Sequence, residues 1–542
     1  MNFDITGLCE ILRQYSEIII YGTGDYAQKI YPYLVQEGLR DKIICFTQTD
    51  KCKNKVYEGI LVINIDELKC NKAECVVLVA TSKLYSEEIR QTLIKHQYSN
   101  ILLLSDYEFN YRINEQKFLS LNTFDDYCEA IVNWYLRTHP DQSDQKKLLQ
   151  ELKDRGENAD EGKDLNLIVM ICGLMTSRSN KIIRALTRKG YKIVMLYHGL
   201  NKRPWDMEEF RKLDILVYEC QYVEEMLYKA LQYKPLIYFY EPRWADCTWA
   251  EILLKNKKYF GKIAIGIYDI LNDGGYVGLP QSRLDTEKYA LENADGVVWK
   301  WFSKQTLEEK GFCIKGKSIL FMDYCDVNCE NYEVYVDTDS SVIKLCMVLG
   351  VDSIICEERK KQTKYTSLAK LEEILDKIGN REDCLFHLYV GQMLREREEL
   401  CRHYESKYSN FKLYLNTERS QLLEKLSKYD YGCYLYVKGE MPPDDYAIDN
   451  MTGSCMRNHE RNTFFDYFGV GLPMIATMPQ KFLEYMQKYD VIIPLYISNL
   501  DIDYLRKNKQ HFKENTKLVR KEFNIENQIG RLIDFFNEVS YA

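Results

Sequence analysis

Short apolar runs alternate with amphipathic helical segments along almost the whole chain. The first run, residues 17–21, is followed by a helical pattern over residues 26–37 and by a second apolar run at residues 42–46. Repeated alternation of this kind is typical of parallel sheets covered by helices on both faces. The sequence therefore predicts an α/β fold built of Rossmann-like domains.

Three series of this kind follow one another, which agrees with a length of 542 residues, enough for about three domains. The first series ends near residue 110. Apolar residues then recur at helical spacing, and a polar stretch follows up to residue 164. We expect a Rossmann-like domain, a helical connector with a linker, two further α/β domains and a C-terminal helix, which cover residues 1–110, 111–163, 164–330, 331–524 and 525–542.

Composition excludes several classes of function. The formal net charge is −8 and no long basic tract is present, so nucleic acid is not an expected partner. The longest apolar run, residues 165–175, is about half the ~20 residues that a membrane helix requires, and the N-terminus lacks a signal-peptide pattern. The 18 cysteines include no CxxC pair and no Cys/His cluster at zinc spacing. We expect a cytoplasmic protein without a metal site.

A glycine turn joins the first expected strand to the first helix. Gly22 and Gly24 fall in the pattern Gly-x-Gly-x-x-Ala, which permits a tight turn and a close approach of the backbone to a pyrophosphate. Asp50 follows the second strand, where a carboxylate would bind a ribose. Asp25, in the first helical turn, would repel a phosphate. A redox dinucleotide site and a vestigial or regulatory domain both remain open.

The same stretch carries Gly59, Val62 and Ile63, followed by Asp-Glu-Leu at residues 66–68. In these features it resembles the small sugar- or nucleotide-sensing domain found at the front of several polysaccharide-biosynthesis proteins. The resemblance implies a nucleotide or a sugar as the ligand of this domain.

Three segments of the last two domains match one family pattern. They are residues 292–298 (ENADGVV), residues 428–435 (KYDYGCYL) and residues 462–475 (NTFFDYFGVGLPMI). Through them, residues 165–542 resemble glycosyltransferases of the GT-B fold, particularly those that build bacterial surface polysaccharides. The resemblance implies two Rossmann-like domains facing an interdomain cleft, a nucleotide-sugar substrate, no cofactor and no bound metal. It also implies that the C-terminal helix crosses back to the acceptor-side domain.

The third segment is the most specific. Its spacing predicts a helix beginning at Asn462, with phenylalanines facing the sheet and Asp466 directed away from them. The resemblance implies that Asp466 accepts hydrogen bonds from the ribose of the donor. The lysine of the family pattern is replaced by Thr463 and its glutamate by Asn458, with Glu460 nearby, so a retaining or an inverting outcome remains open.

Two basic segments are candidate sites for the donor diphosphate. Arg457 and His459, beside Glu460, precede the helix that carries Asp466. Arg359 and Lys364 lie in the segment that follows Gly350, and the resemblance implies an Arg and a Lys there.

Residues of the acceptor-side domain are candidates for the general base. Asp269 follows an apolar strand, where a parallel sheet releases its carboxyl end, and it could serve an inverting transfer. His198 is the rival, because a neutral imidazole acts near pH 7 with little perturbation of its pKa.

Residues 181–212 carry nine Lys and Arg against three acids. Such a patch could bind a diphosphate-linked acceptor or make peripheral contact with an anionic membrane.

We therefore expect an enzyme that moves a sugar from a nucleotide-sugar onto a glycan or a lipid-linked glycan. A nucleotide-activated polyol-phosphate transferase of the same architecture is an alternative. Because the family lysine and glutamate are missing, a non-catalytic protein that binds nucleotide-sugars or acts as a scaffold is another.

Overall fold

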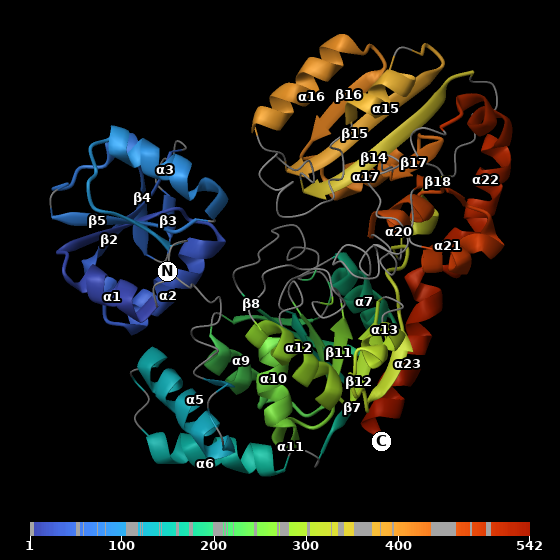
Figure 1. The fold of residues 1–542 in the computed structure, drawn as a ribbon. Helices are drawn as coiled ribbons and strands as arrows, with labels where there is room; N and C mark the ends of the chain where they lie inside the picture. The colour runs from blue at the N-terminus through green and yellow to red at the C-terminus, as the bar shows by residue number, and fades with distance from the viewer. Residues whose placement is uncertain are drawn as a thin grey trace. The chain divides into compact units, whose positions relative to one another are not determined.

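The computed structural model describes residues 5–542 except 50–54, 58, 73, 82, 105–117, 120, 122, 140, 142–143, 159–161, 173–176, 199–209, 211–212, 214, 221, 243–246, 268–269, 271–280, 301–303, 327, 334–340, 352–370, 380, 393–394, 435–461, 477–479 and 495–499. These residues form two compact units (Figure 1). The first comprises residues 1–134, 198–202 and 221–225, and the second contains the rest of the chain. The boundaries expected from the sequence stay predictions.

The first unit is built on a six-stranded sheet in the order β3-β4-β2-β1-β5-β6. Its strands are β1 (Glu17–Tyr21), β2 (Ile43–Gln48), β3 (Lys55–Tyr57), β4 (Ile60–Asn64), β5 (Cys75–Val79) and β6 (Ile101–Leu103), and only β3 pairs antiparallel. Helices α1 (Ile5–Arg13) and α2 (Asp25–Gln36) share one apolar cluster with the sheet, whereas α3 (Lys83–Lys95) contributes to another. The sheet is therefore covered on both faces.

The helical connector follows as α5 (Phe124–Thr138) and α6 (Gln145–Glu157). A seven-stranded sheet in the order β13-β12-β11-β10-β7-β8-β9 comes next. Its strands are β7 (Asp164–Cys172), β8 (Lys192–His198), β9 (Leu216–Cys220), β10 (Pro235–Glu241), β11 (Ile263–Ile267), β12 (Gly296–Trp299) and β13 (Lys317–Leu320). Its helices are α7 (Ser177–Arg188), α9 (Val223–Ala230), α10 (Thr248–Lys255), α11 (Lys257–Phe260), α12 (Gln281–Asn293) and α13 (Lys304–Glu309).

The third sheet has six parallel strands in the order β16-β15-β14-β17-β18-β19. They are β14 (Ile343–Val351), β15 (Cys384–Gln392), β16 (Phe411–Leu415), β17 (Tyr431–Tyr434), β18 (Met474–Ala476) and β19 (Ile492–Pro494). Its helices are α15 (Leu371–Ile378), α16 (Arg395–Lys407), α17 (Arg419–Leu426), α20 (Asn462–Gly469) and α21 (Gln480–Met486). Three sheets with parallel strands confirm the predicted α/β fold.

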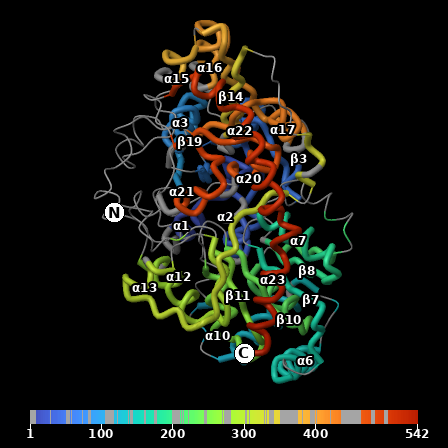
Figure 2. Tube along the Cα trace, turned by 90° about the vertical axis from the view of Figure 1, so that its right-hand side faces the viewer, coloured from blue at the N-terminus to red at the C-terminus, as the bar shows by residue number. Residues whose placement is uncertain are grey.

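Two long helices end the chain, α22 (Ile502–Glu522) and α23 (Ile525–Ser540). Helix α22 contacts β14 and α20, whereas α23 contacts α7, β10 and β13 of the second sheet (Figure 2). Phe535 and Val539 pack so close to Gly296 that a Cβ there would lie 2.8 and 2.9 Å from them. The end of the chain thus completes the core of the second sheet.

One continuous cluster of buried side chains joins the second and third sheets. It includes residues of α7 and α23, of the linker after β13, and of α20.

No helix in the described part of the chain combines the length and the apolar character that a membrane-spanning segment requires.

Candidate functional site

Four charged side chains are buried together at the carboxyl edge of the second sheet. Glu241 is the last residue of β10, Lys300 follows β12, Asp323 follows β13, and Arg178 lies in the first turn of α7. In open α/β sheets, ligands bind beyond the carboxyl ends of the strands. We call these four residues the buried charge cluster.

Arg178 is the centre of this cluster. Its Nη1 donates to Glu241 Oε1 at 3.2 Å, its Nη2 donates to the carbonyl of Phe321 at 2.7 Å, and its Nε lies 3.7 Å from Asp323 Oδ1. Lys300 Nζ lies 2.7 Å from Asp323 Oδ2. The charges are balanced two against two, as the removal of ions from water requires.

Glu241 is only partly satisfied within the cluster. Its second carboxylate oxygen, Oε2, is buried and has no hydrogen-bond partner among the described residues. Burial raises the pKa of Glu241 above its ordinary value, and Arg178 and a hydrogen bond from the Ser179 hydroxyl oppose this shift. A buried carboxylate with one unused oxygen is therefore present at the edge where ligands bind.

Helix α7 binds the linker between the second and third sheets through one cationic face. Lys181 Nζ donates to the carbonyl of Tyr324 at 2.7 Å, and Arg188 Nη2 donates to Asn328 Oδ1 at 3.1 Å. Arg184 Nη1 lies 4.0 Å from Asp326 Oδ1. Residues three and four apart share a helix face, so Arg178, Lys181, Arg184 and Arg188 form one stripe along the linker.

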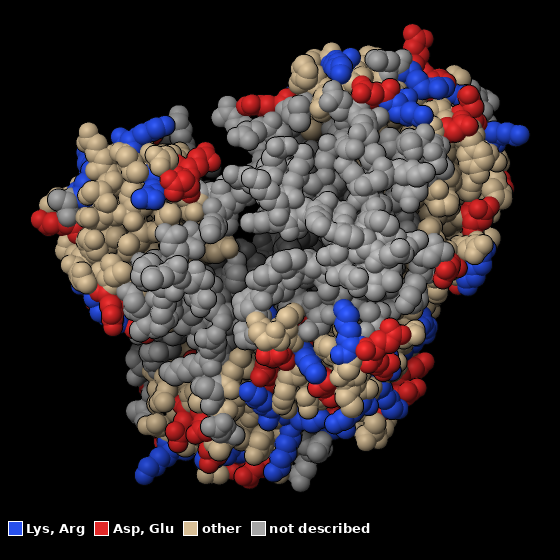
Figure 3. All heavy atoms as spheres, in the orientation of Figure 1, with Lys and Arg blue, Asp and Glu red and all other residues tan. Residues whose placement is uncertain are grey.

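This stripe corrects the predicted basic surface patch. Lys181 is buried, Arg188 pairs with Glu526 at 3.0 Å, and Lys192 pairs with Asp164 at 2.9 Å. The prediction was wrong for Lys181, which contacts protein rather than a membrane, and the patch residues between 202 and 212 lie outside the described residues. On the face drawn in Figure 3, described Lys and Arg side chains are interspersed with Asp and Glu.

Helix α20 is docked tightly on the third sheet. Phe464, Phe465, Tyr467 and Phe468 are buried, and the Tyr467 hydroxyl accepts from the Val348 amide at 2.9 Å. The same hydroxyl donates to the carbonyl of Cys433 at 3.4 Å. The Tyr467 ring also occupies the space that a side chain at Gly432 would need. The position of α20 relative to β14 and β17 is therefore fixed.

Asp466 lies on the remaining face of α20 and keeps 14% of its side chain exposed. Its Oδ1 lies 3.5 Å from Lys181 Nζ, and this pair joins α20 of the third sheet to α7 of the second. As predicted, the carboxylate does not share the burial of the phenylalanines. A lysine partner of Asp466 was not predicted, and the ribose-binding role of Asp466 stays a prediction.

The other predicted site residues cannot be assembled around Asp466. Asn462 begins α20, Gly350 lies in β14 and His198 ends β8, but the side chains of Asn462 and His198 lie outside the described residues. The same holds for the remaining predicted residues, which are Arg457, His459, Glu460, Arg359, Lys364 and Asp269. Their roles stay predictions.

The glycine turn of the first unit has the predicted backbone. Gly22 has φ +107°, and a Cβ there would lie 3.1 Å from the carbonyl oxygen of Ala80, so a side chain would be strained. Gly24 precedes α2, and the hydroxyl of Thr23 donates to Gln48 Oε1 at 3.2 Å. Asp50 lies outside the described residues. The turn is present, and its ligand stays a prediction.

No group of His, Cys, Asp or Glu among the described residues could hold a metal ion.

Residues 14–102 match the family described as C2185-like, N-terminal. No curated protein matches the chain. Among solved structures, the sucrose-phosphate synthase of Thermosynechococcus elongatus is similar over 68% of this chain and 98% of its own, with 13% identity and a TM-score of 0.45.

Two further solved structures are similar at comparable distance. The lipopolysaccharide outer core galactosyltransferase WaaB covers 68% of this chain and 99% of its own, with 10% identity and a TM-score of 0.43. The wall teichoic acid polymerase TagF covers 77% of this chain and 99% of its own, with 12% identity and a TM-score of 0.39.

Proposed function

We propose that this chain is a glycosyltransferase of the GT-B type, which moves a sugar from a nucleotide-sugar onto a glycan or a lipid-linked glycan. The setting of Asp466 carries the proposal. It is a partly exposed carboxylate on a helix whose other large side chains are buried, and it lies at the junction of two Rossmann-like sheets. A carboxylate so placed can accept hydrogen bonds from both hydroxyls of a ribose.

The course of the chain supports this proposal. A linker joins the second sheet to the third, and α23 returns from the third sheet to pack on α7, β10 and β13. This is the connection that the GT-B resemblance implies. Two domains joined in this way can close on a substrate about the linker.

In the proposed reaction, Asp466 binds the ribose, and basic residues balance the departing nucleoside diphosphate. Arg457 and His459 form one candidate group for this role, and Arg359 and Lys364 form the other. No cofactor is needed, because the diphosphate is already a good leaving group. The first unit, with its glycine turn, is proposed to bind a nucleotide or sugar separately from transfer.

Calorimetric titration with UDP, GDP and CDP tests the proposal. We expect the wild type to bind at least one of them and Asp466→Ala to bind it about 10- to 150-fold more weakly, which corresponds to about 1.5–3 kcal/mol for a lost hydrogen bond to a charged group. Asp326→Ala is the matched control, because Asp326 also faces a cation of α7 but belongs to the linker.

Three outcomes would redirect the proposal. Equal affinity in the wild type and Asp466→Ala would remove the ribose assignment. Preferential binding of CDP, together with turnover of CDP-glycerol and not of nucleotide-sugars, would favour the polyol-phosphate alternative. Binding without any turnover of a donor would favour a non-catalytic nucleotide-sugar-binding protein.

A further inference from the structure

The two carboxylate oxygens of Glu241 differ, because one accepts a hydrogen bond from Arg178 and the other has no hydrogen-bond partner among the described residues. Its side chain is 6% exposed, and Oε1 accepts from Arg178 Nη1 at 3.2 Å. Oε2 has no partner in the part of the chain that the structure describes. A buried polar atom without a hydrogen bond destabilises the folded state, so its presence in a folded protein needs an explanation.

The surroundings of Glu241 place it at a functional edge. It ends β10, which lies between β7 and β11 in the middle of the sheet. The adjacent residue of β11 is Gly266, where a Cβ would lie 3.2 Å from Glu241 Cγ. The Phe239 ring and the Glu241 side chain fill the place that a side chain of residue 266 would take, so Glu241 packs directly against the backbone of β11 at the carboxyl end of the sheet.

The two carboxylates of the cluster differ, because both oxygens of Asp323 lie beside a cation, whereas only Oε1 of Glu241 does. The fixed Oε1 of Glu241 sets the orientation of the group, and Oε2 can then accept a hydrogen bond from a hydroxyl. Burial also raises the pKa of Glu241, which makes the carboxylate a stronger base.

We propose that Glu241 binds the hydroxyl of the acceptor and takes its proton during transfer. This inference rests on the proposed function and adds a residue that the sequence did not single out beside Asp269 and His198. As the hydroxyl oxygen bonds to the anomeric carbon, its proton passes to Glu241 Oε2. The bond from that carbon to the diphosphate breaks, and its electron pair leaves with the nucleoside diphosphate. Water then removes the proton from Glu241.

Charged and titratable groups face Glu241 from every side of the cluster. Arg178 of α7 and Lys300 after β12 favour its ionised form, as does the hydroxyl of Ser179. Asp323 of the linker disfavours it, and Cys172 at the end of β7 is a buried neutral thiol whose pKa lies well above its ordinary value. The group therefore titrates as part of this neighbourhood.

Glu241→Gln tests the proposal, with Glu526→Gln as the matched control. Both residues pair with an arginine of α7, but Glu526 lies on α23, away from the carboxyl edge. UDP-glucose, UDP-N-acetylglucosamine and GDP-mannose serve as donors and water as the acceptor, and release of nucleoside diphosphate is followed from pH 5 to 9. Calorimetry gives the affinity for the nucleoside diphosphate.

We expect Glu241→Gln to bind the nucleoside diphosphate within about twofold of the wild type and to release it at least about 100-fold more slowly, the usual contribution of a general base. The acid limb of the wild-type pH profile should disappear. Glu526→Gln should match the wild type in affinity, rate and pH profile.

Three results would overturn the inference. They are a wild-type rate and acid limb in folded Glu241→Gln, an equal loss of rate in Glu526→Gln, and a wild type that binds the nucleotide but releases none at any pH. If the wild type binds no nucleoside diphosphate, the proposed function is wrong. The inference about Glu241 is then wrong as well, because it rests on that function. Should Glu241→Gln not fold, Glu241→Asp keeps the charge, and an undiminished rate in that variant contradicts the proposal.

Discussion

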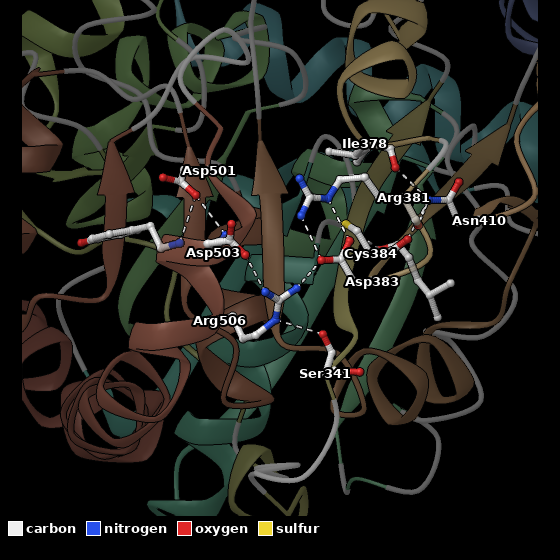
Figure 4. A network of polar contacts seen from close by, with 11 residues as sticks. Ser341, Ile378, Arg381, Asp383, Cys384, Asn410, Asp501, Asp503 and Arg506 are labelled. Atoms are coloured by element: carbon white, nitrogen blue, oxygen red, sulfur yellow. Dashed lines mark hydrogen bonds and ion pairs between the residues drawn. The ribbon is translucent and has the colours of Figure 1, made fainter.

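Two charge clusters of this protein each tie a helix to the edge of a sheet, in opposite ways. At the amino edge of the third sheet, Asp383 lies between Arg381 and Arg506, and Arg506 of α22 also donates to the carbonyl of Ser341 at 3.0 Å (Figure 4). Both oxygens of Asp383 are used, and 34% of its side chain is exposed. At the carboxyl edge of the second sheet, the four side chains of the buried charge cluster are almost fully buried, and Glu241 Oε2 has no hydrogen-bond partner among the described residues.

The difference separates a structural network from a candidate site. Asp501 caps α22 by accepting from the amides of Asp503 and Tyr504, so Asp501 and Arg506 together anchor the start of that helix (Figure 4). The Asp383 carboxylate is partly exposed and both of its oxygens accept hydrogen bonds. The buried charge cluster is expensive to maintain and incompletely paired, which is the pattern that functional sites commonly show.

The largest expected effect is a difference in the free energy of unfolding that is lost when the central arginine of each cluster is replaced. Arg178→Met leaves Glu241 and the Phe321 carbonyl without their shared donor and removes one of the two cations beside Asp323, and we expect it to destabilise the second unit by about 3–5 kcal/mol. Arg506→Met should cost no more than about 1 kcal/mol, because its partners are hydrated. Urea unfolding followed by circular dichroism measures both, and equal losses would break the comparison.

A smaller effect is expected at the junction of the two sheets. Lys181→Met removes the cation beside Asp466, and we expect the affinity for nucleoside diphosphate to fall up to about tenfold, or about 1.4 kcal/mol, as Asp466 loses its fixed orientation. Arg184→Met, on the same helix face, should leave the affinity unchanged in the same titration. Identical affinities in all three proteins would show that Lys181 does not orient Asp466.

The smallest expected effect is a difference in pH dependence. Arg381 and Arg506 lower the pKa of Asp383, so its contribution to stability is present above pH 4 and is lost as the pH falls through its folded value. Burial raises the pKa of Glu241, so its contribution is present below about pH 4 and is lost as the pH rises through its folded value.

The two carboxylates should therefore respond in opposite directions. Relative to the wild type, Asp383→Asn should lose less stability on acidification, by no more than about 1 kcal/mol because the group is exposed. Glu241→Gln should lose less on going from pH 4 to pH 8. Thermal unfolding across this range measures both slopes, and shifts of the same sign would show that the two environments do not differ as described.

The sequence predicted the central strands because each is a continuous apolar run. Strands β1 and β2 were expected at residues 17–21 and 42–46, within a few residues of their bounds, and α20 was expected to begin at Asn462. The short strands β3, β13 and β19 were not expected. Strand β13 is the example, since it lies at the edge of its sheet and its side chains are only partly buried, so it leaves no strong pattern.

The candidate site was predictable only where one segment carries it. Asp466 belongs to a local motif and could be singled out, whereas Arg178, Glu241, Lys300 and Asp323 lie far apart in the sequence and meet only through the fold. One signal was available, because Glu241 and Lys300 are charged residues at the ends of buried strands. The basic run was misread at Lys181 because charge alone does not reveal which helix face is covered.

The return of α23 has a consequence for the order in which the protein matures during synthesis. The ribosome completes residues 164–330 early, but Phe535, Phe536 and Val539, which fill the core of that sheet, emerge only after residues 331–524. Domains generally fold as they emerge from the N-terminal side. Residues 164–330 can complete their core only when α23 has been synthesised. A chain truncated before α23 therefore cannot complete this domain. Protease resistance of ribosome-stalled chains should appear in the third sheet before it appears in the second.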